Sequence, residues 1–468
     1  MAQISDRYVS TRGDASDADF AEALLRGMAP DGGLYMPGAW PSLSPDAWAA
    51  GRGYAEIASR AMAPFIGDAL PAGALDRRAL ARLTSGFEPD EVTPLRKLED
   101  SLYMLELFHG PTAAFKDLAM QLAAALSSEA LKASGERLTL VTATSGDTGA
   151  AAVAAFANTD RVRLIVLHPH ERVSPVQRRQ MTTVEAPNVL NLAVRGDFDD
   201  CQRLVKGLLA DESLRSAGRF SSVNSINWAR LAGQIPYYVS AVSQLAAMGE
   251  TRAPVFVVPT GNFGDAFAGI AASKMGLPVA GFVAAVNRND ALARAINDGV
   301  YARKAAVETA SVSMDVQAPS NFERLVFEAS GRDAELTRTL FETFAREGTV
   351  TLPPALLDAI RAEVSAVSVS EETTRDQIAH AHATWGQVVC PHTAVALSAA
   401  RGVDRSRGPV VALSTAHPAK FGKDVAPVVG FDPEPPRVIR ELGDRAERFE
   451  VIDADASAAL AAVRAFAA

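Results

Sequence analysis

One lysine of the sequence lies where an amine could do chemistry. The stretch LFHGPTAAFKDLAMQ, from Leu107 to Gln121, has a turn followed by small and apolar residues that predict a helix. Lys116 stands at the start of this helix, directly after Phe115. Taken alone, it is best interpreted as a solvated lysine, because a buried ammonium group needs a partner or a task. If apolar neighbours keep the amine neutral, however, it becomes a nucleophile or a base.

Two turns of small residues have the composition of phosphate-binding sites. The turn at 144–149 (TSGDTG) and the turn at 260–265 (TGNFGD) each follow an apolar run and precede a helical one. Glycine lets backbone N–H groups approach a ligand closely, and a helix N-terminus adds roughly half a positive charge. Neither turn is a Walker A loop or a G-x-G-x-x-G fingerprint, and packing or capping alone explains such junctions as well. Two of them in one chain favour a protein that handles two phosphate groups.

An arginine gives a third indication of phosphate binding. In SSVNSINWARLAGQ, Asn227 is predicted to cap a helix and Arg230 to lie in its first turn. The planar guanidinium group holds phosphate through two hydrogen bonds, and the helix dipole adds to the attraction. A surface arginine beside a helix cap is the alternative.

Short strands that alternate with helices are expected to position these residues. Apolar, β-branched runs separated by helical periodicity predict βαβ units and parallel sheets covered on both faces. Both turns then fall at the carboxyl ends of strands, where ligands bind in such sheets. The region before residue 96 is predicted to be short helices, residues 301–385 mostly helical, and the tail an amphipathic helix that carries Leu460, Val463 and Phe466. The predicted strands are LTLVTA (138–143), RLIVLH (163–168), NVLNLAV (188–194), PVFVVPT (254–260), GFVAAV (281–286) and PVVALST (409–415).

Composition and charge exclude several classes of protein. The 468 residues are too many for one typical core, so about two or three domains are expected. A net charge of −9 argues against a nucleic-acid partner, which requires a basic surface. The most apolar stretch, from Phe267 to Val286, is interrupted by Lys274 and Pro278, so no membrane span is expected.

Cysteine and histidine give no sign of a disulfide framework or a metal site. Cys201 and Cys390 are the only cysteines, and neither is part of a C-x-x-C motif. The histidine pairs in LHPHE and in the helical run near residue 380 lack the i, i+4 spacing of metal ligands. The N-terminus has no apolar segment typical of a secretion signal. We therefore expect a cytoplasmic protein without a metal.

Taken together, the motifs resemble those of the threonine synthase family, and its bacterial and fungal branch in particular. They follow one another in the family's order from about Tyr8 to Lys423, and little is recognisable beyond that residue. An ordered series is far more specific than any single short motif. The resemblance is carried by ELFHGPTAAFKD, TATSGDTGAA, SINWARLAGQ, PTGNFGD and STAHPAKF, and YVSTRG, PDGGLYMP, GDFDDCQ and CPHTAVA also fit.

The resemblance implies an α/β fold and an activity. Family members have fold type II of the pyridoxal 5′-phosphate (PLP) enzymes, the tryptophan synthase beta-like family, with two parallel-sheet α/β domains and a mainly helical N-terminal domain. The implied ranges are 1–95 for the N-terminal domain, 96–250 for the smaller α/β domain and 251–468 for the larger one. The implied reaction converts O-phospho-L-homoserine and water into L-threonine and phosphate, with PLP as the cofactor. The expected partner is then a phosphorylated amino acid, with no nucleic acid or membrane, and the expected state is a monomer or a homodimer.

The resemblance also implies roles for single residues. Lys116 corresponds to the Schiff-base lysine, whose amine Phe115 and Leu118 would keep neutral by desolvation. Thr415 would face the pyridine nitrogen, where a hydroxyl can both donate and accept. Asp147 stands where the shorter branch has an asparagine that contacts the cofactor O3′, and this contact is left open. The cofactor phosphate would be bound by Gly261, Asn262, Phe263, Gly264 and Asp265, and the substrate phosphate by Thr144, Ser145, Thr148, Asn224 and Arg230.

Several alternatives stay open at this point. Asp265 is equally well explained as a cap of the following helix, because a carboxylate beside a phosphate is unfavourable. A phospho-lyase on the same scaffold would eliminate phosphate but release a 2-oxo acid, and the motifs do not separate it from a synthase. A non-catalytic PLP-binding protein is disfavoured because the lysine and both turns are present, and a dinucleotide-binding dehydrogenase because G-x-G-x-x-G is absent. His109 and Asp117 have no assigned role beyond orienting or capping the loop.

Overall fold

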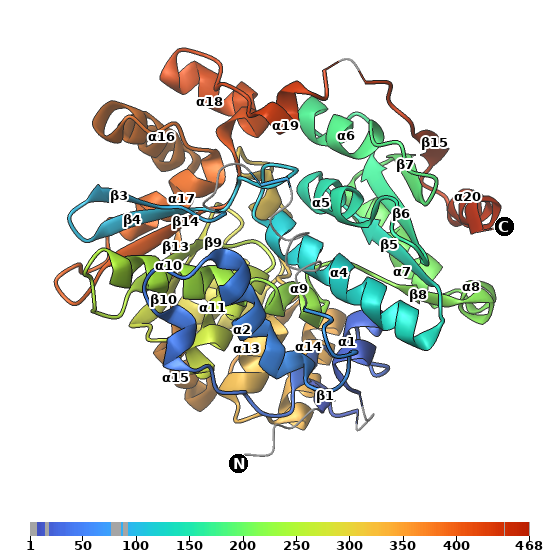
Figure 1. Cartoon of the computed structure of the whole chain (residues 1–468), viewed down its shortest axis with the longest axis horizontal. Helices are drawn as coiled ribbons and strands as arrows, with labels where there is room; N and C mark the ends of the chain where they lie inside the picture. Colours follow the sequence, from blue (N-terminus) through green and yellow to red (C-terminus); the bar gives the residue numbers. More distant parts are fainter. Residues whose placement is uncertain (1–6, 15–17, 76–85, 88–91, 444, 468) are drawn as a thin grey trace.

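Runs of β-branched and apolar residues form the two main sheets of the molecule. The structure is a computed structural model, and it describes residues 7–14, 18–75, 86–87, 92–443 and 445–467. The two sheets lie on either side of a long, nearly completely buried helix, α4 (Lys116–Ser134) (Figure 1). This arrangement places the carboxyl ends of strands from both sheets around the start of that helix.

The larger sheet has six strands in the order β13-β10-β9-β14-β4-β3. All neighbours in it are parallel except β3 and β4, which form an antiparallel pair. Alternate residues of β14 enter different cores: Val411 and Leu413 face one hydrophobic cluster, Val410 and Ala412 another. Both faces are therefore covered, which explains the continuous apolar run. The strands are β3 (Leu95–Glu99), β4 (Leu102–Glu106), β9 (Val255–Pro259), β10 (Gly281–Val286), β13 (Val364–Ser368) and β14 (Val410–Ser414).

The smaller sheet has five strands, all parallel, in the order β15-β7-β6-β5-β8. Leu138 and Leu140 of β5 (Leu138–Ala143) face the core that contains α4, whereas Val141 faces a separate core beneath α7 (Phe198–Ala210) and α20 (Ala456–Ala467). The strands are β5 (Leu138–Ala143), β6 (Val162–Pro169), β7 (Val189–Arg195), β8 (Arg219–Ser221) and β15 (Glu450–Asp453).

Helices cover both sheets, and two short antiparallel strand pairs stand apart from them. The remaining helices are α1 (Phe20–Arg26), α2 (Tyr54–Ile66), α5 (Asp147–Phe156), α6 (Pro175–Thr182), α7 (Phe198–Ala210), α8 (Glu212–Ala217), α9 (Trp228–Ala232), α10 (Ile235–Ala247), α11 (Gly264–Lys274), α12 (Ala291–Asp298), α13 (Phe322–Ala329), α14 (Ala334–Glu347), α15 (Pro354–Glu363), α16 (Glu371–Trp385), α17 (Pro391–Ala400), α18 (Gly422–Val429), α19 (Arg437–Arg440) and α20 (Ala456–Ala467). The 3₁₀ helices are η1 (Pro45–Trp48), η2 (Val312–Met314) and η3 (Pro418–Phe421), and the paired strands are β1 (Tyr8–Ser10) with β2 (Tyr35–Pro37) and β11 (Val300–Ala302) with β12 (Thr349–Thr351).

The predicted fold class is confirmed, and each of the six predicted runs forms a strand. The region 301–385, predicted mostly helical, also contains β12 and the edge strand β13. The first 95 residues contain the β1–β2 pair besides their helices. These short strands were not predicted, because three to five residues at an edge give little periodic signal.

Sheet membership crosses the predicted ranges 96–250 and 251–468. Strand β4 lies in the first range but pairs with β14 of the larger sheet. Strand β15 lies in the second range but pairs with β7 of the smaller sheet. In Figure 1 the chain after α18 passes through α19 across the top of the molecule to β15 and α20. The C-terminal segment therefore connects the two sheets.

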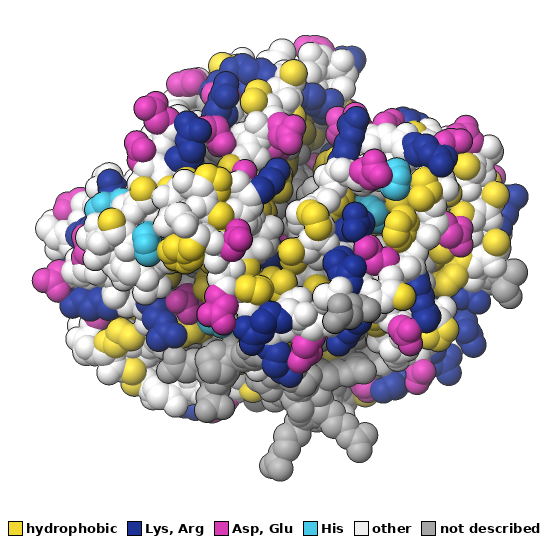
Figure 2. Space-filling view, turned by 90° about the horizontal axis from the view of Figure 1, so that it is seen from above, with side chains coloured by type: hydrophobic (Ala, Val, Ile, Leu, Met, Phe, Trp, Pro, Cys, Tyr) yellow, Lys and Arg dark blue, Asp and Glu magenta, His cyan; other side chains and the backbone are white. Residues whose placement is uncertain are grey.

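The surface carries charges of both signs. Figure 2 shows one face on which basic and acidic side chains are interspersed, without a large patch of one sign. Within the described ranges, no helix is both long enough and apolar enough to cross a membrane.

Candidate active site

Lys116 lies in a largely buried position at the first residue of α4. Its side chain is 13% exposed, and its Nζ atom is 3.2 Å from Oδ2 of Asp147 and 4.9 Å from the centre of the Phe115 ring. Burial lowers the pKa of the amine, Asp147 opposes this effect, and the positive charges of Lys420 and Arg230 lower the pKa further. The balance favours a neutral amine more than in an ordinary lysine.

The turn before Lys116 is fixed by its neighbour Asp117. This fully buried carboxylate accepts the backbone N–H of Thr112 at 2.8 Å and the Thr112 hydroxyl at 2.7 Å. Burial raises the pKa of Asp117 to about 6, against these hydrogen bonds. A side chain at Gly110 would collide with Asp117, because an added Cβ would lie 2.6 Å from Oδ2. Asp117 therefore caps the loop.

The end of β14 is tied to the start of α4. The backbone N–H of Phe115 donates to the carbonyl of Thr415 at 2.8 Å, and Ala114 forms an isolated bridge with Ala416. Thr415 is buried and directly follows the strand. The two segments that supply Lys116 and Thr415 are thus held side by side.

Asp147, the first residue of α5, connects several elements at the site. Its Oδ1 lies 2.7 Å from Nζ of Lys420 and accepts a hydrogen bond of 2.8 Å from Gln177, while Oδ2 faces Lys116 and the Ser313 hydroxyl at 3.4 Å. Burial alone would raise the pKa of Asp147, but the charges of Lys420 and Lys116, with hydrogen bonds from Lys420 and Gln177, hold it well below its usual range. Asp147 is therefore ionised.

The turn at 144–149 presents backbone donors. Thr144 is buried, and its hydroxyl oxygen accepts the N–H groups of Gly146 and Gly149, both at 2.9 Å. This folds the chain so that, among the described residues, the N–H groups of Ser145, Asp147 and Thr148 have no acceptor. Unpaired N–H groups at a helix N-terminus form a site for an anion.

The turn at 260–265 has the same property. Among the described residues, the N–H groups of Gly261, Asn262, Phe263 and Gly264 have no protein acceptor. Phe263 adopts a left-handed conformation, with φ of 62°, directly before α11 begins. Such successive N–H groups form a nest for a phosphate.

Asp265 is bonded to residues outside this nest. Its Oδ1 accepts the hydroxyls of Tyr237 at 2.5 Å and Tyr238 at 2.7 Å, both on α10. Burial raises the pKa of Asp265 to about 6. Its carboxylate thus joins α11 to α10, while the backbone of the turn is left to bind the anion.

Arg230 is a buried cation without a carboxylate partner in the part of the chain that the structure describes. It is 4% exposed, its Nη1 donates to the carbonyl of Val223 at 2.8 Å, and its Nε has no partner. Burial lowers its pKa to about 10. Nearby, Asn224 accepts the Thr142 hydroxyl at 2.6 Å. A buried guanidinium group with a free donor is well suited to bind an anionic ligand.

These observations fit PLP together with a second phosphate. The nest at 261–264 has four donors for one phosphate, and the nest at 144–149 with Arg230 has donors for another. Lys116 supplies the amine to which an aldehyde can attach. Of the predicted residues, Arg230 lies close enough to Lys116 to affect the pKa of its amine, whereas Asp265 is bonded to the tyrosines of α10.

Three residues that sequence reasoning did not single out also lie here. Lys420 is fully buried against Asp147, and His392 accepts the backbone N–H of Ser313 at 3.2 Å. Burial lowers the pKa of His392 to about 4, so its ring is neutral, with Nε2 as the acceptor. Lys420 and His392 stand within STAHPAKF and CPHTAVA, so those motifs were a usable signal. Ser313 lies outside every motif and gave none.

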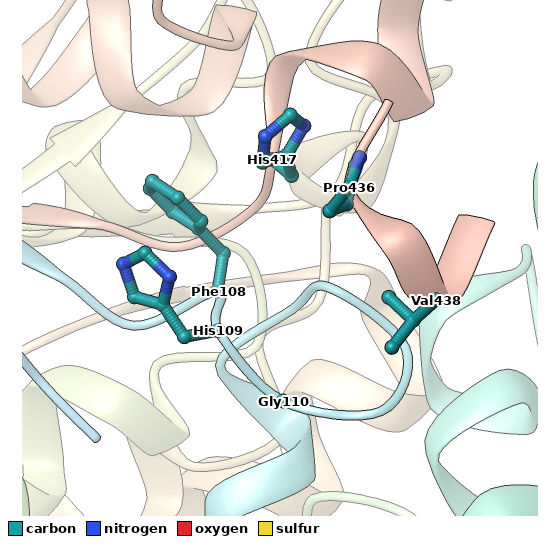
Figure 3. A pocket seen from close by; sticks show the side chains of 6 residues that line it. All are labelled: Phe108, His109, Gly110, His417, Pro436 and Val438. Atoms are coloured by element: carbon teal, nitrogen blue, oxygen red, sulfur yellow. The ribbon is translucent and has the colours of Figure 1, made fainter. Parts of the chain in front are cut away.

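His109 and His417 line a small pocket beside the site (Figure 3). His109 is bonded through Nε2 to Glu106 at 2.8 Å, and His417 accepts the N–H of Ala419 at 3.2 Å through Nδ1. Burial, with the charges of His109 and Lys420, lowers the pKa of His417 to about 4. Both histidines hold loops that frame the site. The pocket is lined by Phe108, His109, Gly110, His417, Pro436 and Val438.

Family models match nearly the whole sequence. A model described as pyridoxal-phosphate dependent enzyme matches residues 87–416, and models for the threonine synthase N terminus and C-terminal region match residues 7–80 and 393–466. The last match extends beyond Lys423, where motif comparison found little.

Individual proteins agree with this result over their full lengths. A threonine synthase from Pseudomonas aeruginosa is 42% identical over 464 residues, covering 98% of this chain and 97% of its own. A PLP-bound threonine synthase structure from Brucella melitensis is 43% identical, with a TM-score of 0.94 and coverage of 98% of this chain and 99% of its own. The yeast threonine synthase structure is 33% identical with a TM-score of 0.92, and covers 99% of both chains.

Proposed function

Because the chain belongs to the threonine synthase family of pyridoxal-phosphate-dependent enzymes, we propose that it converts O-phospho-L-homoserine and water into L-threonine and phosphate. One observation carries this proposal most directly. Arg230 is a buried guanidinium group with an unpartnered Nε, close enough to Lys116 to affect its charge. A phosphorylated substrate would satisfy this cation, whereas an amino acid without a phosphate would leave it unpaired.

The cofactor is proposed to bind between the nest and Lys116. The N–H groups of Gly261, Asn262, Phe263 and Gly264 would hold its phosphate, with Asp265 fixing the first turn of α11 through Tyr237 and Tyr238. The hydroxyl of Thr415 would face the pyridine nitrogen. When bound, pyridoxal phosphate supplies an electron sink for the negative charge that develops at Cα of the substrate.

Residues of the other sheet are proposed to hold the substrate phosphate. Thr144, Ser145 and Thr148 lie in the first nest, and Ser145 and Thr148 bring unpaired N–H groups. Arg230 on α9 supplies the charge, and Asn224 follows β8, the strand that pairs with β5. Held this way, the phosphate lies against a helix N-terminus when it leaves Cγ, and its negative charge is stabilised there.

Lys116 is proposed to move the protons. The reaction removes one proton from Cα and one from Cβ, releases phosphate from Cγ, adds a proton to Cγ, adds water at Cβ and returns a proton to Cα. A buried amine with a lowered pKa is suited to accept a proton at Cα and to return it. Asp147 lies within hydrogen-bond reach of this amine and orients it.

The decisive experiment analyses the products formed from O-phospho-L-homoserine in ¹⁸O-labelled water. We expect threonine and phosphate in equal amounts, with the label in the threonine hydroxyl and none in the phosphate, because the Cγ–O bond breaks. A 2-oxo acid in place of threonine would identify the phospho-lyase instead. Labelled phosphate would show simple ester hydrolysis and would overturn the proposal.

A second measurement tests Lys116 itself. The purified protein should show a visible absorbance band from the attached cofactor, and Lys116→Ala should abolish that band. Lys132→Ala, at an exposed position on the same helix, is the matched control and should keep it. A native protein that PLP cannot colour would contradict the proposal.

The cysteines bear on the cellular location that we propose. Cys201 and Cys390 are both free and buried, which fits a reducing compartment such as the cytoplasm. A monomer or a homodimer remains the expected state.

A further inference from the structure

A second lysine is buried more deeply than Lys116. The side chain of Lys420, on η3, is 0% exposed, compared with 13% for Lys116. Its Nζ lies 2.7 Å from Oδ1 of Asp147 and donates to the carbonyl of Thr112, also at 2.7 Å. A buried ammonium group is stable only with such partners, and Lys420 has both a carboxylate and a carbonyl within hydrogen-bond distance.

Asp147 carries a single negative charge between two amines. Lys420 lies 2.7 Å from one oxygen of this carboxylate, and Lys116 lies 3.2 Å from the other. Electrostatic attraction grows as the distance shortens, and Lys420 has a carbonyl partner in addition. The charge of Asp147 is therefore balanced by Lys420, and Lys116 is left without a full counter-charge.

Among the described residues, Asp147 is the main negative charge that acts on Lys116. Arg230 from α9 adds positive charge, and His392 from α17 is neutral. Asp117 on α4 is bonded to Thr112. Asp265 from α11 accepts two tyrosine hydroxyls through Oδ1, while its Oδ2 has no partner. Burial raises the pKa of Asp265 to about 6, although the tyrosine hydrogen bonds and the charge of Lys116 lower it, so this carboxyl is a weaker counter-charge than Asp147. His417, next to η3, is also neutral, because burial lowers its pKa to about 4.

We propose that Lys420 is a positioning residue of the reaction, which binds the Asp147 carboxylate and so keeps Lys116 as the unprotonated amine. The inference rests on one part of the proposed function, namely that the cofactor is attached to Lys116. Lys420 also joins η3 to the loop before Lys116 through Thr112, so one side chain sets both the charge and the position of the amine.

The two partners are expected to have opposite effects. In Lys420→Met, Asp147 loses its close cation and its charge acts on Lys116 alone, which favours the protonated amine. In Asp147→Asn, the charge of Lys420 stays while the carboxylate is gone, which disfavours protonation. The double variant removes both charges and should behave nearly like the native protein. If Asp147 and Lys420 had only a structural role, the two single variants would shift the pH midpoint in the same direction or not at all.

The test follows the visible absorbance of the holoenzyme against pH, without substrate. In this form the Lys116 nitrogen would be bonded to the cofactor, and the absorbance reports the protonation of that nitrogen, on which the charges of Asp147 and Lys420 act in the same directions as on the free amine. We expect the pH midpoint of the absorbance change to rise by about one unit or more in Lys420→Met, to fall by about one unit or more in Asp147→Asn, and to return towards the native value in the double variant. Lys420→Arg should keep the midpoint near native. Lys423→Met, at an exposed position three residues on, is the control and should leave it unchanged.

The outcomes separate this inference from the proposed function. The inference is overturned if the pH midpoints of Lys420→Met and Asp147→Asn shift in the same direction. It is also overturned if neither midpoint shifts while both variants keep the cofactor band and the native thermal unfolding midpoint. Should Lys420→Met fail to fold, Lys420→Gln takes its place, because an unchanged or lowered midpoint in that variant contradicts the inference. A product other than threonine would refute the proposed function and leave these midpoints valid.

Discussion

Two buried arginines show how a functional charge differs from a structural one. Arg324 is fully buried, and it donates to the carbonyls of Tyr35 and Ile226 and to the side chain of Asn321. Arg230 is buried almost as completely, yet its Nε has no partner. An unpaired buried donor costs free energy. The unpaired Nε of Arg230 therefore indicates a binding site for a ligand.

Arg230→Lys tests this difference at the level of one residue. A lysine keeps the charge but loses the planar pair of donors that match a phosphate. We expect kcat/KM for O-phospho-L-homoserine to fall by about 10²- to 10³-fold, while the affinity for the cofactor changes little. Steady-state kinetics and cofactor titration measure the two quantities. Arg338→Lys, at an exposed position on α14, is the control. Equal losses of turnover and cofactor affinity would count against a role in binding the substrate phosphate.

At the scale of elements, the site is built where strands end and helices begin. The turn after β5 opens α5, the turn after β9 opens α11, and the end of β14 is bonded to the residue before α4. The first two junctions present unpaired backbone N–H groups, and the third holds the residue before Lys116. Parallel strands make this possible, because their carboxyl ends lie at one edge of the sheet.

Gly146→Ala is expected to disturb one such junction. Gly146 has φ of 139°, and an added Cβ would lie 2.4 Å from the side chain of Gln177, which bonds Asp147. The backbone strain alone costs about 1–3 kcal/mol of unfolding free energy. Displacing Gln177 should in addition weaken competitive inhibition by inorganic phosphate. Urea unfolding and inhibition kinetics measure the two effects.

Gly135→Ala is the matched control for this prediction. Gly135 ends α4 with φ of 75°, but no atom lies within 4 Å of an added Cβ. It should lose about 1–2 kcal/mol of stability and keep native inhibition by phosphate. The interpretation of the turn is wrong if the two variants behave alike.

At the scale of the whole molecule, the C-terminal segment connects the two sheets. The chain leaves β14 of the larger sheet, passes through η3, α18 and α19, and adds β15 to the smaller sheet (Figure 1). Helix α20 then covers the core beneath α7 with Ala459 and Val463. Residues near the end of the sequence thus contribute to the stability of a sheet formed mainly by residues 138–221.

The sequence predicted the features that have a local signal. Apolar β-branched runs identified six strands, and the strand–turn–helix pattern identified both nests. Strand β15 was missed, because EVID alternates weakly and three of its four residues are exposed. The contacts of Lys420 could not be predicted, although it lies in a recognised motif, because its partners Asp147 and Thr112 are remote in sequence and meet it only through folding. Contacts between distant residues have no local pattern to detect.

Glu447→Gln tests the connection between the sheets. Glu447 accepts two hydrogen bonds from Arg178 of α6, at 2.8 and 2.9 Å, and one of 2.7 Å from the Thr182 hydroxyl. The hydrogen bond from Arg178, with that from Thr182 and the charges of Arg178 and Arg179, lowers the pKa of Glu447 despite partial burial. Removing this charge should cost about 1 kcal/mol of unfolding free energy at neutral pH and speed hydrogen exchange in β15 and α20.

The pH dependence gives this last prediction its sign. A carboxylate whose pKa is lower in the folded state contributes stability above its unfolded pKa, 4.5 for glutamate, and loses it as the pH falls through the folded value. The stability gap between the native protein and Glu447→Gln should therefore be full at neutral pH and close in acid below pH 4.5. Glu450→Gln, at an exposed position of β15, should show no gap. A gap that does not change with pH would mean that the glutamate acts by packing, because only an ionised carboxylate loses its contribution in acid.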